Sequence, residues 1–372
     1  MSENLPRNVR SLPSRPVNPA RPRIGLVLGA GGVLGAAWLQ GALAALTEET
    51  GWDPGSAELI VGTSAGSVIG SLLACGIPPW YMVAHAEGES FEGLLDAAGD
   101  HASRLSREAG HGFSFERAFP RPGPGSWRLA LGALKEPRRL PPAAVLAGWL
   151  PRGVVSTGPI EEVIRAACAE DWAPHPGLRV VACDYGTGRR VAFGAPDAPE
   201  ALLTEAVAAS CAIPAFYVPP RIGGRTYVDG GLWSVSNLDL LAREELDLVI
   251  CLNPTSSRDG AGAPLGRYFR AQAGRRLGRE AKRVEASGAE VVLIQPLAED
   301  LEVMGENLMS SARRCEVTER ARQTTAWQLR GLKGELAGLP TGAAPFVQRP
   351  PGAPATWAPF GHAARERFPA AA

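Results

Sequence analysis

The amino-acid sequence predicts an α/β fold with a largely parallel central sheet. Short apolar runs alternate with longer helix-like segments along most of the chain, which is typical of parallel strands joined by helices. Two of these runs end in a glycine-rich turn that leads straight into a helix. Among the 372 residues, 45% are hydrophobic and 20% are charged. The chain can therefore bury a substantial core, and disorder over most of its length is excluded.

Two strand–turn–helix units open the regular part of the chain, after a Pro-rich and flexible lead-in. The expected strands lie at 24–28 and 59–61, and each is followed by a glycine turn and a helix, at about 33–50 and 66–75. Gly76 and Pro78 end the second helix, because glycine is a common helix terminator and proline cannot continue one.

The middle of the chain, residues 79–155, mixes charge with proline and has patchy apolar periodicity, so we predict a helical, irregular insertion or cap. Beyond it, the pattern predicts helices at 160–169 and 201–210, strands at 178–183, 190–193, 248–252 and 291–295, a hairpin at 221–228, and helical blocks at 265–288 and 306–336. We divide the chain into a lead-in at 1–22, a main domain at 23–254 containing the insertion, a C-terminal region at 255–337 that completes it, and a Pro/Ala-rich tail at 338–372.

Charge and cysteine usage exclude several classes of protein. Lys plus Arg and Asp plus Glu are both 38, so the formal net charge is zero. This balance argues against a general nucleic-acid binder, which needs a basic excess. The six cysteines are scattered and form no Cys-x-x-Cys pair, which favours buried thiols in a reducing compartment over a disulfide framework. We expect a cytoplasmic protein without a metal or cofactor.

A membrane anchor is the alternative reading of the first apolar region. Residues 24–47 carry no charge, and that length can span a bilayer. The run contains six glycines, however, and reads equally well as a buried strand, turn and helix. Residues 1–22 contain no apolar core of a secretory signal. We therefore favour the strand–turn–helix interpretation.

The first motif with chemical meaning is Gly62-Thr63-Ser64-Ala65-Gly66, a G-x-S-x-G pattern between an apolar strand and an apolar helix. A serine on such a tight turn exposes its Oγ above the sheet, and the flanking glycines remove side chains that would collide there. The following helix points its positive N-terminus at the same place. The pattern predicts a nucleophilic Ser64, and the alternative is a chance match or a helix cap.

The second motif is Gly29-Ala30-Gly31-Gly32-Val33-Leu34-Gly35, which also lies between a strand and a helix. Its backbone N–H groups can form an oxyanion hole. The alternative is a dinucleotide-binding turn, which needs a glycine three positions after Gly31 and an acid at the end of the second strand. This chain has Leu34 where that glycine is needed, and the Ser64 turn where the acid is needed. A dinucleotide-binding role is therefore weakly supported.

The third motif is Val228-Asp229-Gly230-Gly231, after a strand-like segment. An aspartate at a strand end, followed by two glycines, can be aimed into a cleft by a tight turn. Taken alone, Asp-Gly is more often a plain turn. Its meaning therefore depends on what else lies nearby.

Histidine decides between hydrolytic mechanisms. A hydrolase with the chain order Ser, acid, His needs a histidine after Asp229, and the only one there is His362 in the tail. The other four histidines precede Asp229, and we expect surface or structural roles for them: His85, His101, His111 and His175. The acidic run around His85 offers metal ligands, but a solvated helix face is the simpler interpretation. A Ser–Asp dyad without histidine becomes attractive.

The motifs together resemble the patatin-like phospholipases. A further stretch, Ala209-Ser210-Cys211-Ala212-Ile213-Pro214, is similar to the Ala-Ser-x-Ala-x-Pro segment of that family. The resemblance covers about residues 24–252. It implies a three-layer α/β/α sandwich and a phospholipase A or lysophospholipase-like activity through an acyl-serine intermediate. It also implies one role for each motif: Ser64 as nucleophile, Asp229 as general base, and an oxyanion loop built by Gly29, Gly31, Gly32 and Gly35.

One position departs from that family. Many members carry Arg or Lys where this chain has Leu34, so oxyanion stabilisation would rest more fully on backbone N–H groups. A catalytically weak lipid-binding or regulatory protein with the same fold is therefore the second hypothesis. The presence of both Ser64 and Asp229 favours the enzyme, because a binding module needs neither.

A basic segment offers a route to lipid. Residues 265–288 contain seven basic side chains and two acidic ones. An apolar side can be built from Leu265, Tyr268, Phe269, Leu277 and Val284. In a neutral protein such a helix can attract anionic headgroups, and the plain alternative is a surface helix packed on the sheet. We expect a lipid ester substrate, peripheral contact with an anionic membrane surface, and no nucleic-acid partner.

Overall fold

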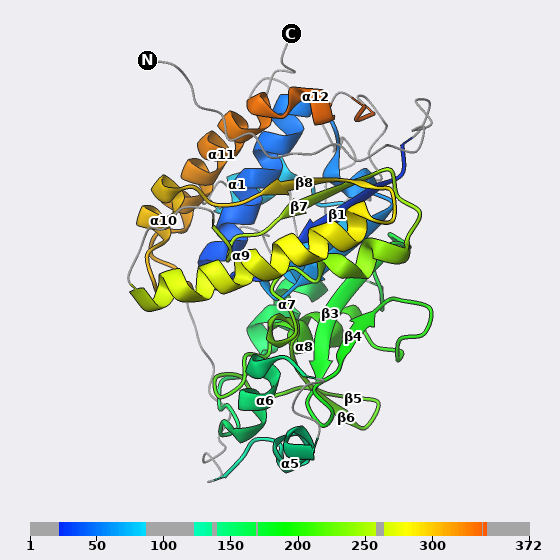
Figure 1. Cartoon of the computed structure of the whole chain (residues 1–372), viewed down its shortest axis with the longest axis vertical. Helices are drawn as coiled ribbons and strands as arrows, with labels where there is room; N and C mark the ends of the chain where they lie inside the picture. Colours follow the sequence, from blue (N-terminus) through cyan, green and yellow to red (C-terminus); the bar gives the residue numbers. More distant parts are fainter. Residues whose placement is uncertain are drawn as a thin grey trace.

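The computed structural model describes residues 22–86, 123–135, 140–168, 170–257, 264–336 and 338–340. Its centre is an eight-stranded sheet with helices on both faces (Figure 1). The predicted α/β class and three-layer arrangement are confirmed. Most of the lead-in, residues 87–122 of the insertion and the tail beyond 340 lie outside the described residues.

Five parallel strands form the core of the sheet, in the order β3-β2-β1-β7-β8. Their bounds are β1 (Ile24–Leu28), β2 (Leu59–Thr63), β3 (Leu178–Asp184), β7 (Leu248–Leu252) and β8 (Glu290–Ile294). In register, Val27 of β1 lies opposite Val61 of β2 and Cys251 of β7. Every residue of β1, β2 and β7 is buried, because helices cover both faces. This explains their uninterrupted apolar sequences.

Three further strands run antiparallel beside β3 or each other: β4 (Arg190–Phe193), β5 (Arg221–Ile222) and β6 (Arg225–Asp229). The first half of β3 pairs with both β2 and β4, and its second half pairs with both β4 and β6. Since a strand has only two edges, β2 and β6 must share one edge of β3. They lie end to end there, and β6 begins to pair where β2 stops.

The two faces of the sheet build separate apolar clusters. On one face, Leu26 and Ile60 pack with helices α1 (Gly32–Thr50), α2 (Ala65–Ala74), α8 (Leu203–Cys211) and α11 (Arg314–Gly331). On the other face, Val27 and Val61 pack with the 3-10 helix η3 (Leu238–Arg243) and with α9 (Pro264–Glu285). Alternate side chains of each strand point to opposite faces, so β1 contributes to both clusters.

The described residues within 79–155 include three helices. These are α3 (Pro79–Ala86), α5 (Trp127–Lys135) and α6 (Pro142–Trp149), and α7 (Gly158–Ala167) follows them. Leu129 of α5 and Ala147 of α6 pack against Cys183 and Val228. The Tyr185 hydroxyl donates a hydrogen bond to the Ala147 carbonyl at 3.0 Å. The α5–α6 pair is thus anchored on β3 and β6.

The C-terminal helical block is shorter than predicted. Two helices were not resolved from the pattern, α10 (Ala298–Met304) and the terminal α12 (Lys333–Leu336), and α11 begins at Arg314 rather than near 306. The loop between α10 and α11 contacts the start of α1, where the Leu308 carbonyl accepts a hydrogen bond from the Leu34 N–H at 2.9 Å. A segment that supports the start of α1 in this way cannot also continue a helix.

The membrane-anchor alternative for residues 24–47 is wrong, because this segment divides into β1, a turn and most of α1. Among the described residues, no helix combines the length and the apolar character that crossing a bilayer requires.

Candidate active site

Ser64 lies on a strained turn between β2 and α2. Its φ of 53° and ψ of −121° place a non-glycine residue in a sparsely populated backbone region, which costs about 1–3 kcal/mol and persists only where the surroundings enforce it. Neighbouring glycines permit the turn. A Cβ on Gly62 would meet the Gly66 carbonyl oxygen at 2.5 Å, and a Cβ on Gly66 would collide with the Leu28 carbonyl. This is the backbone geometry expected of a nucleophile elbow, and Ser64 itself is buried in the structure.

Asp229 reaches the same place from the end of β6. Thr63 is opposite Val181 of β3, and Asp229 is opposite the next residue, Ala182. The end-to-end arrangement of β2 and β6 therefore brings the two motifs together. The Ser64 side chain lowers the pKa of the Asp229 carboxyl, so the structure brings the two predicted residues within range of each other.

The environment of Asp229 changes its acidity. The side chain is buried, and loss of hydration raises its pKa from 3.8 to about 6. A hydrogen bond from the Gly231 N–H, at 2.7 Å, and the influence of the Ser64 side chain favour the ionised form and limit this rise. The carboxylate is thus a stronger base than a solvated aspartate, and it is aimed at a serine hydroxyl.

The segment at 209–214 supports both partners. The Ser64 N–H donates to the Ser210 hydroxyl at 2.9 Å, and that hydroxyl donates onward to the Val181 carbonyl at 2.6 Å. The Asp229 N–H donates to the Ala212 carbonyl at 3.0 Å. Ser210 is completely buried. Its role could not be predicted from the sequence, beyond its membership of the Ala-Ser-x-Ala-x-Pro stretch.

The predicted glycine loop adjoins the Ser64 turn, since β1 and β2 are neighbours and Gly66 packs on the Leu28 and Gly29 carbonyls. Its four glycines differ in what their N–H groups do. The Gly29 N–H donates to the Leu252 carbonyl, and the Gly35 N–H donates to the Gly31 carbonyl, both at 2.9 Å.

Gly31 and Gly32 stand at the start of α1, where helical N–H groups have no intrahelical partner. Their N–H groups donate to no acceptor among the described residues. Gly32 has a φ of 62°, and a Cβ there would lie 2.9 Å from the Leu308 carbonyl oxygen. Leu34 is buried and turned into the core. Only Gly31 and Gly32 of the four predicted glycines thus keep free donors.

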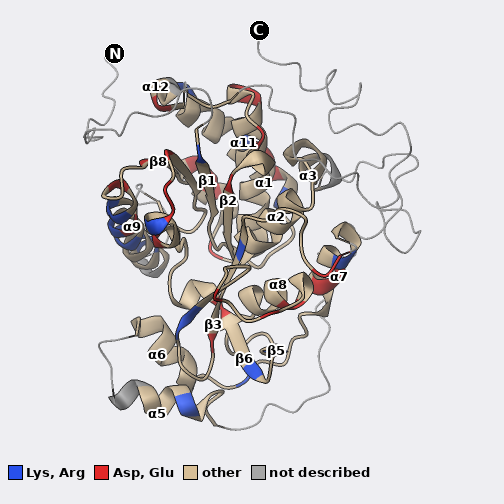
Figure 2. Ribbon diagram, turned by 90° about the vertical axis from the view of Figure 1, so that its right-hand side faces the viewer, with Lys and Arg blue, Asp and Glu red and all other residues tan. Residues whose placement is uncertain are grey.

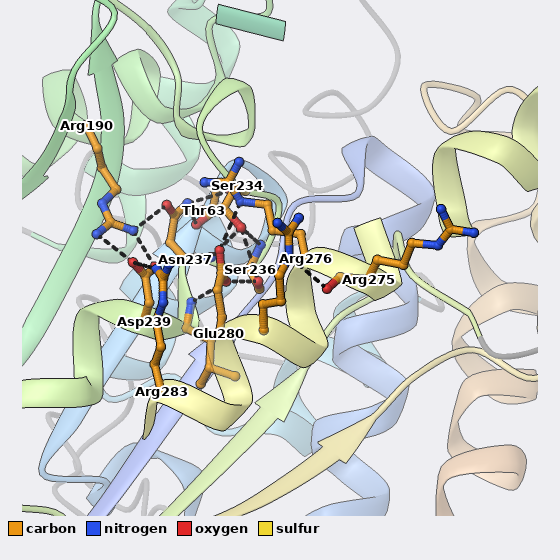
Figure 3. Close-up of polar contacts among 12 residues, drawn as sticks. Thr63, Arg190, Ser234, Ser236, Asn237, Asp239, Arg275, Arg276, Glu280 and Arg283 are labelled. Atoms are coloured by element: carbon orange, nitrogen blue, oxygen red, sulfur yellow. Dashed lines mark hydrogen bonds and ion pairs between the residues drawn. The ribbon is translucent and has the colours of Figure 1, made fainter. Parts of the chain in front are cut away.

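A polar cluster missed by the sequence analysis contacts Thr63, the residue before Ser64 (Figure 3). Asn237 is completely buried, and its amide nitrogen donates to the Thr63 hydroxyl at 3.0 Å. The only sequence signal was a group of three polar residues shortly after Asp229: Ser234, Ser236 and Asn237. Nothing in that pattern indicated contact with the residue before Ser64.

Histidine and metal are not part of the described centre. His175 is buried away from the dyad, where its ring bonds the Ala57 carbonyl at 2.8 Å and accepts from the Gly177 N–H at 3.0 Å, in agreement with the structural role expected for it. His101, His111 and His362 lie outside the described residues. In the part of the chain that the structure describes, no group of three His, Cys, Asp or Glu side chains could hold a metal ion.

Two solved structures are similar to the chain at low sequence identity. VipD from Legionella pneumophila is 17% identical, with 84% of this chain and 67% of that chain covered and a TM-score of 0.39. The type III effector protein ExoU is 16% identical, with 83% of this chain covered and a TM-score of 0.31. The match spans 53% of the ExoU chain, about half of its length.

A family model described as "Patatin-like phospholipase" matches residues 26–242. This range is more than half of the chain. It includes the glycine loop, the Ser64 turn, the segment at 209–214 and Asp229. The chain therefore belongs to the patatin-like phospholipases, a family of lipid acyl hydrolases.

Proposed function

We propose that the protein hydrolyses acyl esters of lipids, with Ser64 as the nucleophile and Asp229 as its general base. The observation that carries this proposal is the juxtaposition, at neighbouring positions along β3, of the strained Ser64 turn and a buried carboxylate whose pKa is raised to about 6. A structural serine needs neither the backbone strain nor the desolvated partner.

The reaction proceeds in two balanced steps. Asp229 takes the hydroxyl proton as the Ser64 Oγ attacks the ester carbonyl carbon, and the tetrahedral intermediate carries a negative oxygen. The intermediate collapses to an acyl-Ser64, and Asp229 returns the proton to the departing alcohol. Water then attacks the acyl group in the same way, which releases a carboxylic acid and restores the serine.

Charge on the tetrahedral oxygen needs donors that are already in place. The N–H groups of Gly31 and Gly32 are suited to this role, because they are free and stand beside the Ser64 turn. Gly29 and Gly35 serve the loop differently, since their N–H groups are already donated to carbonyls. In the proposed mechanism they shape the turn. Leu34 takes no part.

Ester hydrolysis across p-nitrophenyl chain lengths tests the proposal. The wild type should be active, with a preference for acyl chains beyond the shortest. Ser64→Ala and Asp229→Asn should each lose nearly all turnover. The double variant should be hardly worse than either single one, because the pair acts as a unit. Hydrolysis that survives in Ser64→Ala would contradict the proposal.

We also propose that the protein meets its substrate at an anionic membrane surface. Six of the eight large apolar side chains that are exposed in the described residues belong to α5, α6 and α9: Trp127, Leu131, Leu146, Trp149, Tyr268 and Phe269. In Figure 2 these helices lie along one side of the molecule, and α9 carries a concentration of basic residues. Aromatic side chains beside cations favour the interface between water and lipid.

These helices converge on the segment that follows Asp229. Trp233 packs against the apolar cluster that contains Leu129 of α5 and Ala147 of α6, and the Arg276 guanidinium of α9 lies 5.9 Å from its ring centre. The exposed apolar side chains are therefore attached to the elements that border the dyad. A lipid bilayer held there would present its esters to the proposed centre.

A further inference from the structure

We infer that Asn237 is a positioning residue that holds the nucleophile and its base together. The inference rests on the proposed function of Ser64 and Asp229. Because β2 and β6 lie end to end on one edge of β3, no ladder of backbone hydrogen bonds can join them directly. Their relative position decides whether Ser64 meets Asp229, so a side chain that links the two strand ends controls the geometry of the dyad.

Asn237 provides this link. Its Nδ2 donates to the Ser234 carbonyl at 2.6 Å and to the Thr63 hydroxyl at 3.0 Å, and the Gly230 carbonyl is a third, longer contact at 3.4 Å. Thr63 immediately precedes the nucleophile, and Gly230 immediately follows the base. One amide therefore contacts both strand ends from a site with no exposure to solvent.

The residue type fits this position for two reasons. Asn237 has a φ of 53° and a ψ of 27°, in the left-handed helical region, which asparagine adopts more readily than most residues. Its amide also offers two N–H donors together with an acceptor oxygen. Few other side chains can satisfy both the backbone conformation and the hydrogen bonds.

The orientation of the amide is fixed by charged neighbours (Figure 3). The Arg190 guanidinium donates to Asn237 Oδ1 at 3.1 Å, so the nitrogen must face Thr63. Asp239 fixes Arg190 in turn, with contacts of 2.6 and 3.2 Å. The Arg190 guanidinium also lies 5.7 Å from the ring centre of Trp233. These contacts leave one orientation of the amide.

Helix α9 fixes the backbone on both sides of Asn237. Its buried Glu280 accepts from the Ser236 hydroxyl at 2.6 Å and from the Leu238 N–H at 3.1 Å, both through Oε2. Arg276 donates to the other carboxylate oxygen at 3.1 Å. The residues before and after Asn237 are thus bound to one carboxylate on the helix, which gives the amide a rigid support.

Loss of this link should loosen the Ser64–Asp229 contact while both residues remain. A misplacement of about 1 Å in a catalytic group can cost roughly 100-fold in rate. We therefore expect Asn237→Gly, which tolerates the backbone conformation but removes the amide, to lower kcat about 10- to 100-fold with little change in KM. The rate of Ser64 labelling by a fluorophosphonate probe should fall by a similar factor.

Two substitutions of Thr63 separate positioning from general stability. Thr63→Val keeps the shape but removes the acceptor of the amide, so it should resemble Asn237→Gly. Thr63→Ser restores the hydroxyl and should recover most of the labelling rate. Thr324→Val is a matched control, because it removes another buried hydroxyl, which bonds Asp300 at 2.9 Å in the opposite helical layer. It should lower stability without slowing Ser64.

The pH profile of labelling adds a readout that a merely structural role would not move. The Ser64 side chain helps hold down the pKa of Asp229. Loosening the pair should therefore shift the acid limb of the profile to higher pH in Asn237→Gly and Thr63→Val, but not in Thr324→Val.

The outcomes distinguish this inference from the proposed function. If the wild-type protein is labelled at Ser64 and the Asn237→Gly and Thr63→Val variants react as fast with the same pH profile, only the positioning role is overturned. If the wild type is not labelled, or if Ser64→Ala is labelled equally, the nucleophile proposal fails and the positioning role falls with it.

Discussion

Ser64 and Asp229 meet because two strands of opposite direction end against each other on the same edge of β3. The residue before Ser64 is opposite Val181, and Asp229 is opposite Ala182. A parallel strand carries the serine and an antiparallel strand carries the aspartate. The dyad thus depends on one register along β3, and a shift of either strand would separate the two side chains.

The raised pKa of Asp229 should set the acid limb of activity. The carboxylate must be ionised to accept the serine proton, and burial raises its pKa to about 6. We expect kcat/KM for a soluble short-chain ester to be level above pH 7 and to fall about tenfold per pH unit below the limb. Measurement between pH 4.5 and 8 checks this, with circular dichroism to verify folding. A limb near pH 4 would mean that Asp229 works as an ordinary solvated carboxylate.

The same pKa predicts a conflict between stability and activity. Folding raises the pKa of Asp229, so the folded state binds more protons between pH 4 and 6, and the ionised group destabilises the fold increasingly across this range. A difference of about two pKa units is worth up to about 3 kcal/mol above pH 6. Asp229→Asn should therefore raise the free energy of unfolding at pH 8, by an amount that shrinks toward pH 4.

Denaturant titrations of the wild type and Asp229→Asn at pH 8 and pH 4.5 measure this difference. Ser64→Ala is the control, because it keeps the buried charge and removes a hydroxyl that favours the ionised form, so it should bring no gain. Equal stability of Asp229→Asn and the wild type at both pH values would show that the ionised carboxylate is not penalised in the fold.

Gly32 should matter more to turnover than to substrate binding. A side chain at this position would collide with the Leu308 carbonyl, and the backbone φ of 62° is strained for any residue other than glycine. Gly32→Val should therefore displace one of the two free N–H donors. Removing one oxyanion donor typically costs roughly 100- to 1,000-fold in kcat. Gly288→Val is a control for backbone strain, since Gly288 has a φ of 99° with open space around it. A normal kcat in Gly32→Val would show that the glycine loop is a structural turn and does not stabilise the oxyanion.

Much of this centre could be predicted from the sequence. The Ser64 turn, the glycine loop and Asp229 each lie at the end of a strand, and that local pattern is readable without coordinates. Asn237 and Ser210 could not be predicted, because their roles depend on contacts between residues far apart in the chain: 174 positions separate Asn237 from Thr63, and 146 separate Ser210 from Ser64. The short α10 was missed because seven residues give too little periodicity.

The basic helix shows the same limit more clearly. The sequence shows that this helix contains seven cations, but it does not show which of them form ion pairs. Arg276 and Arg283 pair with Glu280 and Asp239, and Arg270 donates to the Gly305 carbonyl. Leu277 and Val284 are buried against the sheet, whereas Tyr268 and Phe269 are exposed. The apolar side expected for this helix is thus divided between the core and the surface.

Removal of the C-terminal tail should spare ester hydrolysis. Truncation just before Pro340 deletes His362, the one histidine that follows Asp229 in the chain. The proposed dyad contains no histidine, so kcat on a short-chain ester should stay close to that of the full chain. Loss of turnover in a truncated protein with an unchanged Tm would point to a Ser-Asp-His triad.

Binding to anionic lipid should depend on the unpaired cations of α9. Four of its basic side chains are exposed and form no ion pair with a described residue: Arg267, Arg275, Arg279 and Lys282. The last three follow a spacing of four and three residues, which places them on one face of the helix. Each basic residue near a negative surface contributes about 1 kcal/mol. Replacing these three with Gln should weaken binding to anionic vesicles by roughly 100-fold.

The choice of these positions follows from the structure. Arg276 is excluded because it bonds Glu280, so changing it would disturb the support of Asn237 as well as the surface charge. A variant with Arg165, Arg320 and Arg330 changed to Gln is the control, because it loses the same number of charges from α7 and α11. It should bind vesicles nearly as well as the wild type.

Co-sedimentation with phosphatidylserine-containing and pure phosphatidylcholine vesicles is the measurement, over a range of salt concentrations. Attraction between exposed charges is screened over about 8 Å at physiological ionic strength, so binding to the anionic vesicles should fall as salt rises. Both variants should still hydrolyse a soluble short-chain ester, because α9 supports the segment around Asn237 through Glu280 and not through its exposed cations. Equal binding to both vesicle types, or an undiminished α9 variant, would leave this helix with a structural role alone.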